Sequence, residues 1–135
     1  HLCLQYNVSL AQQHVVIVGH GRLVGQPAAL WAHTQGAQVT VITRETDLTA
    51  AHAAIAQADV LVLGAGQAGY IIPAMIRPGV VIFDAGTSES SGTVCGDADP
   101  ACAAQASLMT PVPGGIGPLT VACLLRNLVQ LTEPS

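Results

Sequence analysis

Short apolar runs alternate with longer mixed segments along this chain. The runs are dominated by Val, Ile and Leu, with few polar residues between them. They cover residues 14–18, 38–43, 59–63, 80–83 and 108–109. Such runs are typical of strands buried on both faces, and they predict a parallel sheet that helices cover.

The segments between these runs predict the helices. One helix is expected over residues 24–34 and another over 48–57, with Asp47 as its N-cap. The other expected elements are helical pieces at 71–76 and 99–105, a small hairpin within 87–96, a helix end over 2–8 and an amphipathic helix over 117–131. At 135 residues, this order predicts a single α/β domain with a Rossmann-like, doubly wound parallel sheet and helices on both faces.

A glycine-rich turn joins the first expected strand to the first long helix. Gly19, Gly21 and Gly25 have the spacing G-x-G-x-x-x-G. Glycines let a phosphate approach the backbone, and the helix start offers N–H groups and the positive end of its dipole. The turn therefore predicts a pyrophosphate site, with an ordinary tight strand-to-helix turn as the alternative.

A second glycine motif, residues 64–69, reads G-x-G-x-x-G, but Pro73 interrupts the short segment that follows. We expect this loop to pass near the cofactor without holding the pyrophosphate, because no long helix starts there. The carboxyl ends of parallel strands meet at one edge of a sheet, where ligands bind in such domains. The loops expected at that edge are the first glycine turn and residues 43–44, 65–66, 84–87 and 111–115.

The tip of the second strand indicates which dinucleotide the domain takes. An acidic residue there binds the ribose hydroxyls of NAD, whereas a basic residue binds the 2′-phosphate of NADP. Arg44 and the hydroxyls of Thr43 and Thr46 suit NADP, while Glu45 suits NAD. The sequence favours NADP and leaves NAD possible, and the alternative for Arg44 is a solvated charge.

Charge and residue types exclude several function classes. The net charge is −4, and the four basic residues are dispersed arginines, so no basic face for nucleic acid or an anionic membrane is expected. Without lysine, this chain has no Schiff-base nucleophile and no lysine acid or base. No apolar run reaches membrane-spanning length. The cysteines lack metal or disulfide spacing, which predicts free thiols in a reducing cytoplasm and no metal site.

Residues 110–120 read TPVPGGIGPLT, with three prolines and three glycines. This string resembles the PVPGGVGPMT signature of the methylenetetrahydrofolate dehydrogenase/cyclohydrolase family. Three other segments agree in order and spacing: GHGRLVGQP at 19–27 resembles GRSxxVGxP, FDAGT at 83–87 resembles DVGIN, and CGDAD at 95–99 resembles VGDVD. The resemblance extends over residues 2–131.

The resemblance implies a two-domain enzyme that oxidises 5,10-methylenetetrahydrofolate with NADP and hydrolyses the methenyl product. Residues 14–135 would form its NAD(P)-binding domain, and residues 1–13 the end of an interdomain helix with a connector. Together with the strand-end loops, it gives the expected cofactor-binding residues Gly19, His20, Gly21, Arg22, Val24, Gly25, Thr43, Arg44, Ala65, Gly66 and Thr87. It places Pro113, Gly114 and Gly115 where folate and nicotinamide meet.

Departures from the family pattern concern the cofactor end. His20 and Gly21 replace Arg and Ser, which removes a charged donor and a hydroxyl for the 2′-phosphate. Ser88 replaces the Asn that follows the position of Thr87. Asp84, at the end of the fourth strand, is expected to bind neighbouring loop N–H groups, with a catalytic role as the alternative.

The family's catalytic lysine, tyrosine and folate-binding acid belong to an N-terminal lobe that is absent from this sequence. No catalytic residue is therefore expected here, and the isolated chain is expected to bind nucleotide without turning over folate. The folate would be shared with that lobe, and a cytoplasmic homodimer is expected. Two other functions stay open: an NAD(H)-sensing module that regulates a partner, and a degenerate domain that binds nothing.

Overall fold

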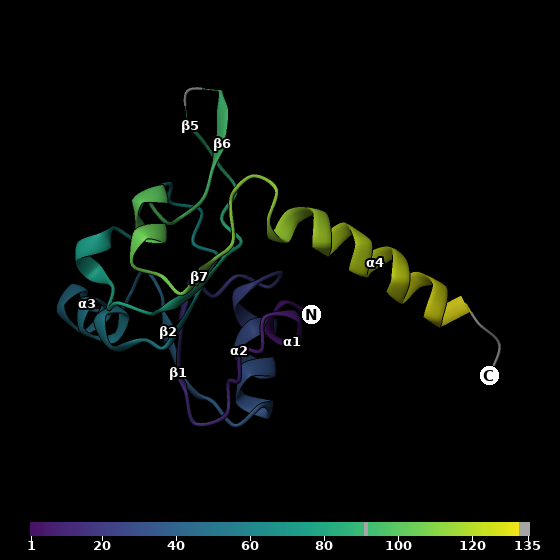
Figure 1. The fold of residues 1–135 in the computed structure, drawn as a ribbon, viewed down its shortest axis with the longest axis horizontal. Helices are drawn as coiled ribbons and strands as arrows, with labels where there is room; N and C mark the ends of the chain where they lie inside the picture. Colours follow the sequence, from purple (N-terminus) through teal and green to yellow (C-terminus); the bar gives the residue numbers. More distant parts are fainter. Residues whose placement is uncertain (91, 133–135) are drawn as a thin grey trace.

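A five-stranded parallel sheet forms the centre of the computed structural model, which describes residues 1–90 and 92–132. Its strand order is β2-β1-β3-β4-β7 (Figure 1). The strands are β1 (His14–Val18), β2 (Gln38–Ile42), β3 (Val60–Leu63), β4 (Val81–Asp84) and β7 (Leu108–Met109). The predicted parallel sheet is thus confirmed, and each strand begins and ends within one residue of its predicted bounds.

The helices follow the predicted order but differ in type and length. The α-helices are α1 (Leu2–Gln5), α2 (Gly25–Thr34), α3 (Leu48–Gln57) and α4 (Ile116–Thr132). The predicted helical pieces at 71–76 and 99–105 are 3₁₀ helices, η1 (Pro73–Met75) and η2 (Pro100–Ala104), each starting at a proline. The predicted helix end over 2–8 is shorter because Asn7 has a left-handed φ of 53°. The hairpin is confirmed as β5 (Ser88–Ser90) and β6 (Thr93–Cys95).

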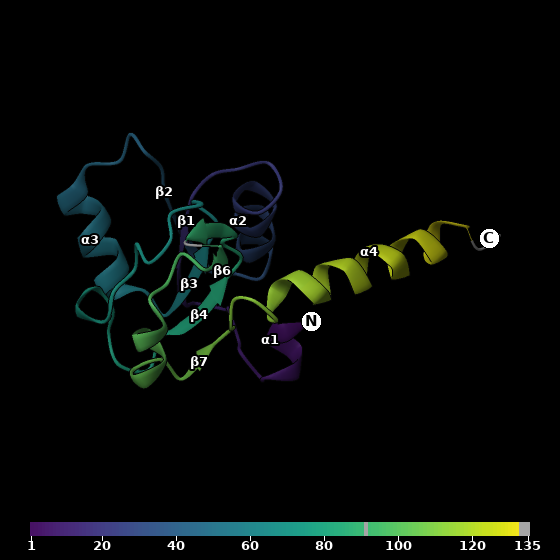
Figure 2. The ribbon, with the colours of Figure 1, turned by 90° about the horizontal axis from the view of Figure 1, so that it is seen from above.

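Helices cover both faces of the sheet, as a doubly wound fold requires (Figure 2). Successive residues of β1 point to opposite faces. Val16 and Val18 pack in the cluster that contains Ala51 and Ile55 of α3, together with residues of β3 and β4. Val15 and Ile17 belong to the other cluster, with Ala32 of α2. The predicted burial on both faces is confirmed for the central strands β1, β3 and β4, whereas most residues of the edge strands β2 and β7 are half-buried.

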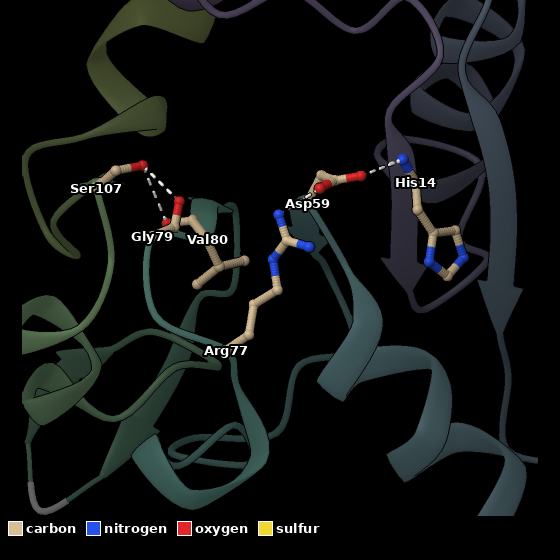
Figure 3. A network of polar contacts seen from close by, with 6 residues as sticks. All are labelled: His14, Asp59, Arg77, Gly79, Val80 and Ser107. Carbon is tan, nitrogen blue, oxygen red and sulfur yellow. Dashed lines mark hydrogen bonds and ion pairs between the residues drawn. The ribbon is translucent and has the colours of Figure 1, made fainter.

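Polar side chains hold the amino-terminal edge of the sheet (Figure 3). The backbone N–H of His14 donates to Asp59 Oδ2 at 2.7 Å, and Arg77 pairs with the other carboxylate oxygen of Asp59. Ser107 Oγ donates to the carbonyl oxygen of Gly79 at 2.8 Å. These bonds connect the segments that enter β1, β3, β4 and β7, so they hold the strand starts together. The loops that follow the strands lie at the opposite edge of the sheet.

The last helix, α4, extends away from the domain as an arm (Figures 1 and 2). None of its described residues is buried, and Leu125 and Leu128 are 59% and 58% exposed. Its first residue, Ile116, packs against the cluster that contains Ala32 of α2, and most of the apolar side chains beyond it are exposed among the described residues. Within the same residues, no helix combines the length and hydropathy needed to cross a membrane.

Candidate functional site

A cavity of about 530 Å³ opens at the carboxyl edge of the sheet, between the loops that follow β1, β2 and β3. This is the edge where the sequence placed the ligand. Six of the fourteen predicted site residues line it: Gly19, His20, Gly21, Thr43, Arg44 and Ala65. The tertiary structure thus brings together residues from three separate loops.

The first glycine turn is tightly packed on one side and open on the other. Gly19 has a φ of +97°, and a Cβ there would lie 2.5 Å from the carbonyl oxygen of Gly64. A Cβ on Gly25 would overlap the carbonyl oxygen of Gly19, whereas one on Gly21 would meet nothing within 4 Å. Gly19 and Gly25 therefore close the turn, and Gly21 leaves open space at the cavity.

The helix that follows this turn, α2, begins at Gly25. Among the described residues, no side chain caps its N-terminus and its first turn contains no acidic residue. The positive end of its dipole is therefore not compensated by a carboxylate of its own first turn. This arrangement suits an anion at the turn.

The turn after β2 forms the other side of the cavity. Its shape depends on two hydroxyls: the N–H of Thr43 donates to Thr46 Oγ1 at 2.9 Å, and the N–H of Glu45 donates to Thr43 Oγ1 at 3.3 Å. Arg44 and Thr46 line the cavity, whereas Glu45 is exposed outside the lining. The residue that suits a phosphate faces the cavity, and the acid that suits a ribose does not line it.

Eight predicted site residues lie outside this lining: Arg22, Val24, Gly25, Gly66, Thr87, Pro113, Gly114 and Gly115. Val24 is half-buried and packs so closely on Gly64 that a Cβ at that glycine would lie 2.9 Å from Val24 Cγ1. Thr87 follows β4 and the segment from Pro113 follows β7, further along the same edge. Their proposed contacts with cofactor or folate stay predictions.

Sequence reasoning missed seven lining residues, of which Val18 and Ile42 end β1 and β2 and Gly64 directly follows β3. The other four come from two segments. Leu48 and Ala51 come from the first turns of α3, and Gln67 and Tyr70 from the loop after β3. Leu48 and Ala51 could have been predicted from the sequence, because a helix that starts shortly after the tip of β2 must place its first turns beside that tip. The loop after β3 carried a weaker signal, since only Ala65 and Gly66 in it were predicted to bind the cofactor.

Asp84 has the structural role that was expected of it. It is 1% exposed, and its carboxylate accepts hydrogen bonds from the N–H groups of Gly86, Asp97 and Ala98 at 2.8, 3.1 and 2.8 Å. Its own N–H donates to Thr110 Oγ1 at 2.8 Å, which connects β4 to the start of the proline-rich loop. These bonds use the carboxylate to join loops and leave it no exposed face for chemistry.

The proline-rich loop is equally constrained. Gly114 has a φ of +96°, and a Cβ on Gly115 would overlap the carbonyl oxygen of Pro111. The loop leads directly into α4. Within residues 1–90 and 92–132, no group of three or more His, Cys, Asp or Glu side chains is placed to hold a metal ion.

Residues 1–135 match the family model described as tetrahydrofolate dehydrogenase/cyclohydrolase, NAD(P)-binding domain. The bifunctional protein FolD 2 of Bordetella pertussis is 45% identical over 130 residues, which cover 95% of this chain and 45% of that protein. The bifunctional protein FolD of Thermomicrobium roseum is 43% identical over 131 residues, with 96% and 44% covered. The chain spans less than half the length of these relatives.

Solved structures show the same similarity. The bifunctional enzyme FolD from Campylobacter jejuni superposes with a TM-score of 0.90 at 36% identity, over 96% of this chain and 46% of that one. The Trypanosoma brucei methylenetetrahydrofolate dehydrogenase-cyclohydrolase, solved with NADP and an inhibitor, gives a TM-score of 0.88 at 32% identity, over 95% of this chain and 46% of that one.

Proposed function

Because the chain belongs to the tetrahydrofolate dehydrogenase/cyclohydrolase family, as its NAD(P)-binding domain, we propose that it binds NADP for an enzyme acting on one-carbon folates. That enzyme oxidises 5,10-methylenetetrahydrofolate and hydrolyses the 5,10-methenyl product. Bound NADP supplies the hydride acceptor for the oxidation. The observation that carries the proposal is the cavity at the carboxyl edge, with the glycine turn on one side and Arg44 on the other.

The donor set of the cavity fits each part of the nucleotide. The turn at Gly19 and Gly21 and the start of α2 suit the pyrophosphate, because backbone can approach it there without a Cβ in the way. Arg44 suits the 2′-phosphate, with the hydroxyl of Thr46 in the same lining. Leu48 and Ala51 offer an apolar wall to the adenine ring.

The departure from the family pattern lies within this cavity. His20 and Gly21 line it where the family carries Arg and Ser, so Arg44 is the single arginine in the lining. Charged binding of the 2′-phosphate in this cavity therefore depends on Arg44. We propose NADP as the preferred cofactor, and preferential binding of NAD is the outcome that would favour a sensor or an NAD-using enzyme.

The remaining parts of the proposal concern the rest of the enzyme. Thr87 would lie at the nicotinamide end, and Pro113, Gly114 and Gly115 would form a floor shared with folate. The sequence contains no lysine, so the family's catalytic lysine would come from a folate-binding lobe outside these 135 residues. Residues 1–13 would end the helix that joins the two lobes.

Assembly and compartment are also proposals. We propose a homodimer, as the family resemblance implies. The four cysteines are free, which is compatible with a reducing cytoplasm.

Calorimetric titration of this chain with NADP⁺ and NAD⁺ tests the proposal. We expect NADP⁺ to bind more tightly, and Arg44→Ala to weaken NADP⁺ roughly 10- to 100-fold, because a charge-assisted bond to phosphate is lost. NAD⁺ affinity should change little. Arg126→Ala, which removes the same charge from exposed α4, is the matched control. Equal affinity of the Arg44→Ala variant and the original chain for NADP⁺ would rule out this site for the 2′-phosphate.

A further inference from the structure

Asp97 is a fully buried carboxylate at the base of the β5–β6 hairpin. It accepts hydrogen bonds from three consecutive backbone N–H groups in the loop after β3. Its Oδ2 accepts from Ala65 at 2.6 Å and Gly66 at 3.1 Å, and its Oδ1 accepts from Gln67 at 2.7 Å. One side chain thus binds three consecutive residues of the second glycine motif, 30 to 32 residues away in sequence.

The position of Asp97 is itself held from behind. Its backbone N–H donates to Asp84 Oδ1 at 3.1 Å, and its carbonyl oxygen accepts from the N–H of Ile71 at 3.0 Å. A Cβ on Gly86 would lie 2.5 Å from Asp97 Oδ1, so the loop after β4 packs directly against the carboxylate. The Asp97 side chain therefore cannot shift without moving the loops around it.

The loop that Asp97 holds has little intrinsic preference for one conformation. Residues 64–69 contain three glycines and two alanines, and Gly66 and Gly69 have φ of +67° and +64°. Glycine loses more backbone entropy than other residues when it is ordered. Ala65 and Gln67 line the proposed nucleotide cavity, so the carboxylate that orders this loop also shapes the cavity wall.

Three successive N–H groups that point to one place form an anion-binding nest. In the loop after β3 the nest is filled by the protein's own carboxylate. This explains why a sequence that matches G-x-G-x-x-G is not a phosphate site here: the N–H groups that would hold a phosphate already donate to Asp97. The turn at Gly19 is left as the place for the pyrophosphate.

We propose that Asp97 is a positioning residue for the nucleotide: as the internal anion of the loop after β3, it fixes the wall formed by Ala65 and Gln67 and keeps phosphate out of that loop. The proposal rests on the proposed function. It assigns to Asp97 a role in nucleotide affinity, in addition to its role in stability, although its side chain does not line the cavity.

The test is NADP⁺ affinity of the 135-residue chain by calorimetry, for variants shown to be folded by circular dichroism. Asp97→Asn puts an NH₂ group where a carboxylate oxygen accepts N–H donors, so we expect about tenfold weaker binding or more. Asp99→Asn is the matched control. Asp99 also accepts a backbone N–H, from Ala101 at 2.8 Å, but its side chain caps η2. Its bond to the segment after β3 comes from its backbone N–H, which donates to the carbonyl oxygen of Ile71 at 2.8 Å and which the substitution leaves in place. We expect the NADP⁺ affinity of Asp99→Asn to stay within about twofold of that of the original chain.

If Asp97→Asn does not fold, a second pair of variants tests whether the conformation of the loop after β3 determines NADP⁺ affinity. Gly66→Ala strains the same loop through its positive φ and leaves the carboxylate in place, and we expect NADP⁺ to bind about fivefold more weakly. Gly79→Ala is its control, since Gly79 has a φ of +83° and open space around it but lies before β4, at the other edge of the sheet.

The outcomes separate this proposal from the proposed function. If the original chain does not bind NADP⁺, both are overturned. If it binds and the folded Asp97→Asn variant binds equally well, only the role of Asp97 is overturned, as it is if Gly66→Ala and Gly79→Ala have equal affinity. Backbone NMR adds a further readout: Asp97→Asn should shift the amide signals of Ala65, Gly66 and Gln67, and Asp99→Asn should not.

Discussion

Glycines of one motif have different physical roles in this chain. Gly19 and Gly25 are required because another backbone segment lies where their Cβ would be, whereas Gly21 has free space on that side. Spacing alone could not separate these roles, since all three letters are the same in the sequence. The distinction matters because substitutions of Gly19 and Gly25 should affect folding, whereas a substitution of Gly21 should affect ligand access.

We predict that Gly25→Ala destabilises the chain by about 2 kcal/mol or more, because its Cβ would overlap the carbonyl oxygen of Gly19 in a turn that cannot move freely. Gly21→Ala, four residues earlier in the same motif, should change the free energy of unfolding by no more than about 0.5 kcal/mol. Urea unfolding followed by circular dichroism measures both values. An equal loss in the two variants would contradict the assigned difference.

Among the elements, α3 shows which local signals are reliable. Its observed bounds are the predicted ones, because Asp47 marks its start and its apolar residues recur on one face. The side chain of Asp47 accepts the N–H of Ala50 at 3.0 Å, and Ala51 and Ile55 are buried against the sheet. The 3₁₀ segments η1 and η2 had apolar composition without that periodicity, and each began at a proline.

We predict that Asp47→Ala lowers the free energy of unfolding by about 1 kcal/mol, because an N–H in the first turn of α3 loses its acceptor. Glu45→Ala is the matched control: it removes the same charge two residues earlier, from an exposed side chain. Thermal and urea unfolding should both show the difference. A loss of stability for Glu45→Ala as large as for Asp47→Ala would attribute the effect to charge and exclude the cap.

The whole molecule is a compact sheet domain with one uncovered arm. An apolar crevice of about 480 Å³ lies between α1, α2 and α4, with Leu2, Trp31 and Phe83 in its lining. The chain spans less than half the length of its curated relatives. The crevice and the arm lie on the same side of the molecule as α1. Both are compatible with the proposal that a folate-binding lobe completes the enzyme.

We predict that the double variant Leu125→Gln/Leu128→Gln keeps the unfolding free energy of this chain within about 0.5 kcal/mol, because both side chains are exposed. Leu61→Ala, in the centre of β3, should cost about 2–5 kcal/mol and serves as the buried comparison. Urea unfolding measures both. A cost above about 1 kcal/mol for the double variant would show that α4 packs on the domain in solution.

The amino-acid sequence by itself determined the fold class, the strand positions, the bounds of α3 and the edge of the sheet where the cavity of the candidate site lies. These depend on local patterns: apolar runs, a helix cap, and glycine turns that follow strands. The family resemblance added the expected nucleotide and folate contacts, which remain to be tested.

Only the tertiary structure decided which residues meet. It placed His20, Arg44 and Ala65 in one cavity, left Glu45 outside the lining, and directed the buried Asp97 to a loop 30 residues away. It also showed α4 as an uncovered arm. The physical reason is that hydrogen bonds and packing between distant segments depend on how loops close in space, and no local pattern of residues encodes that geometry.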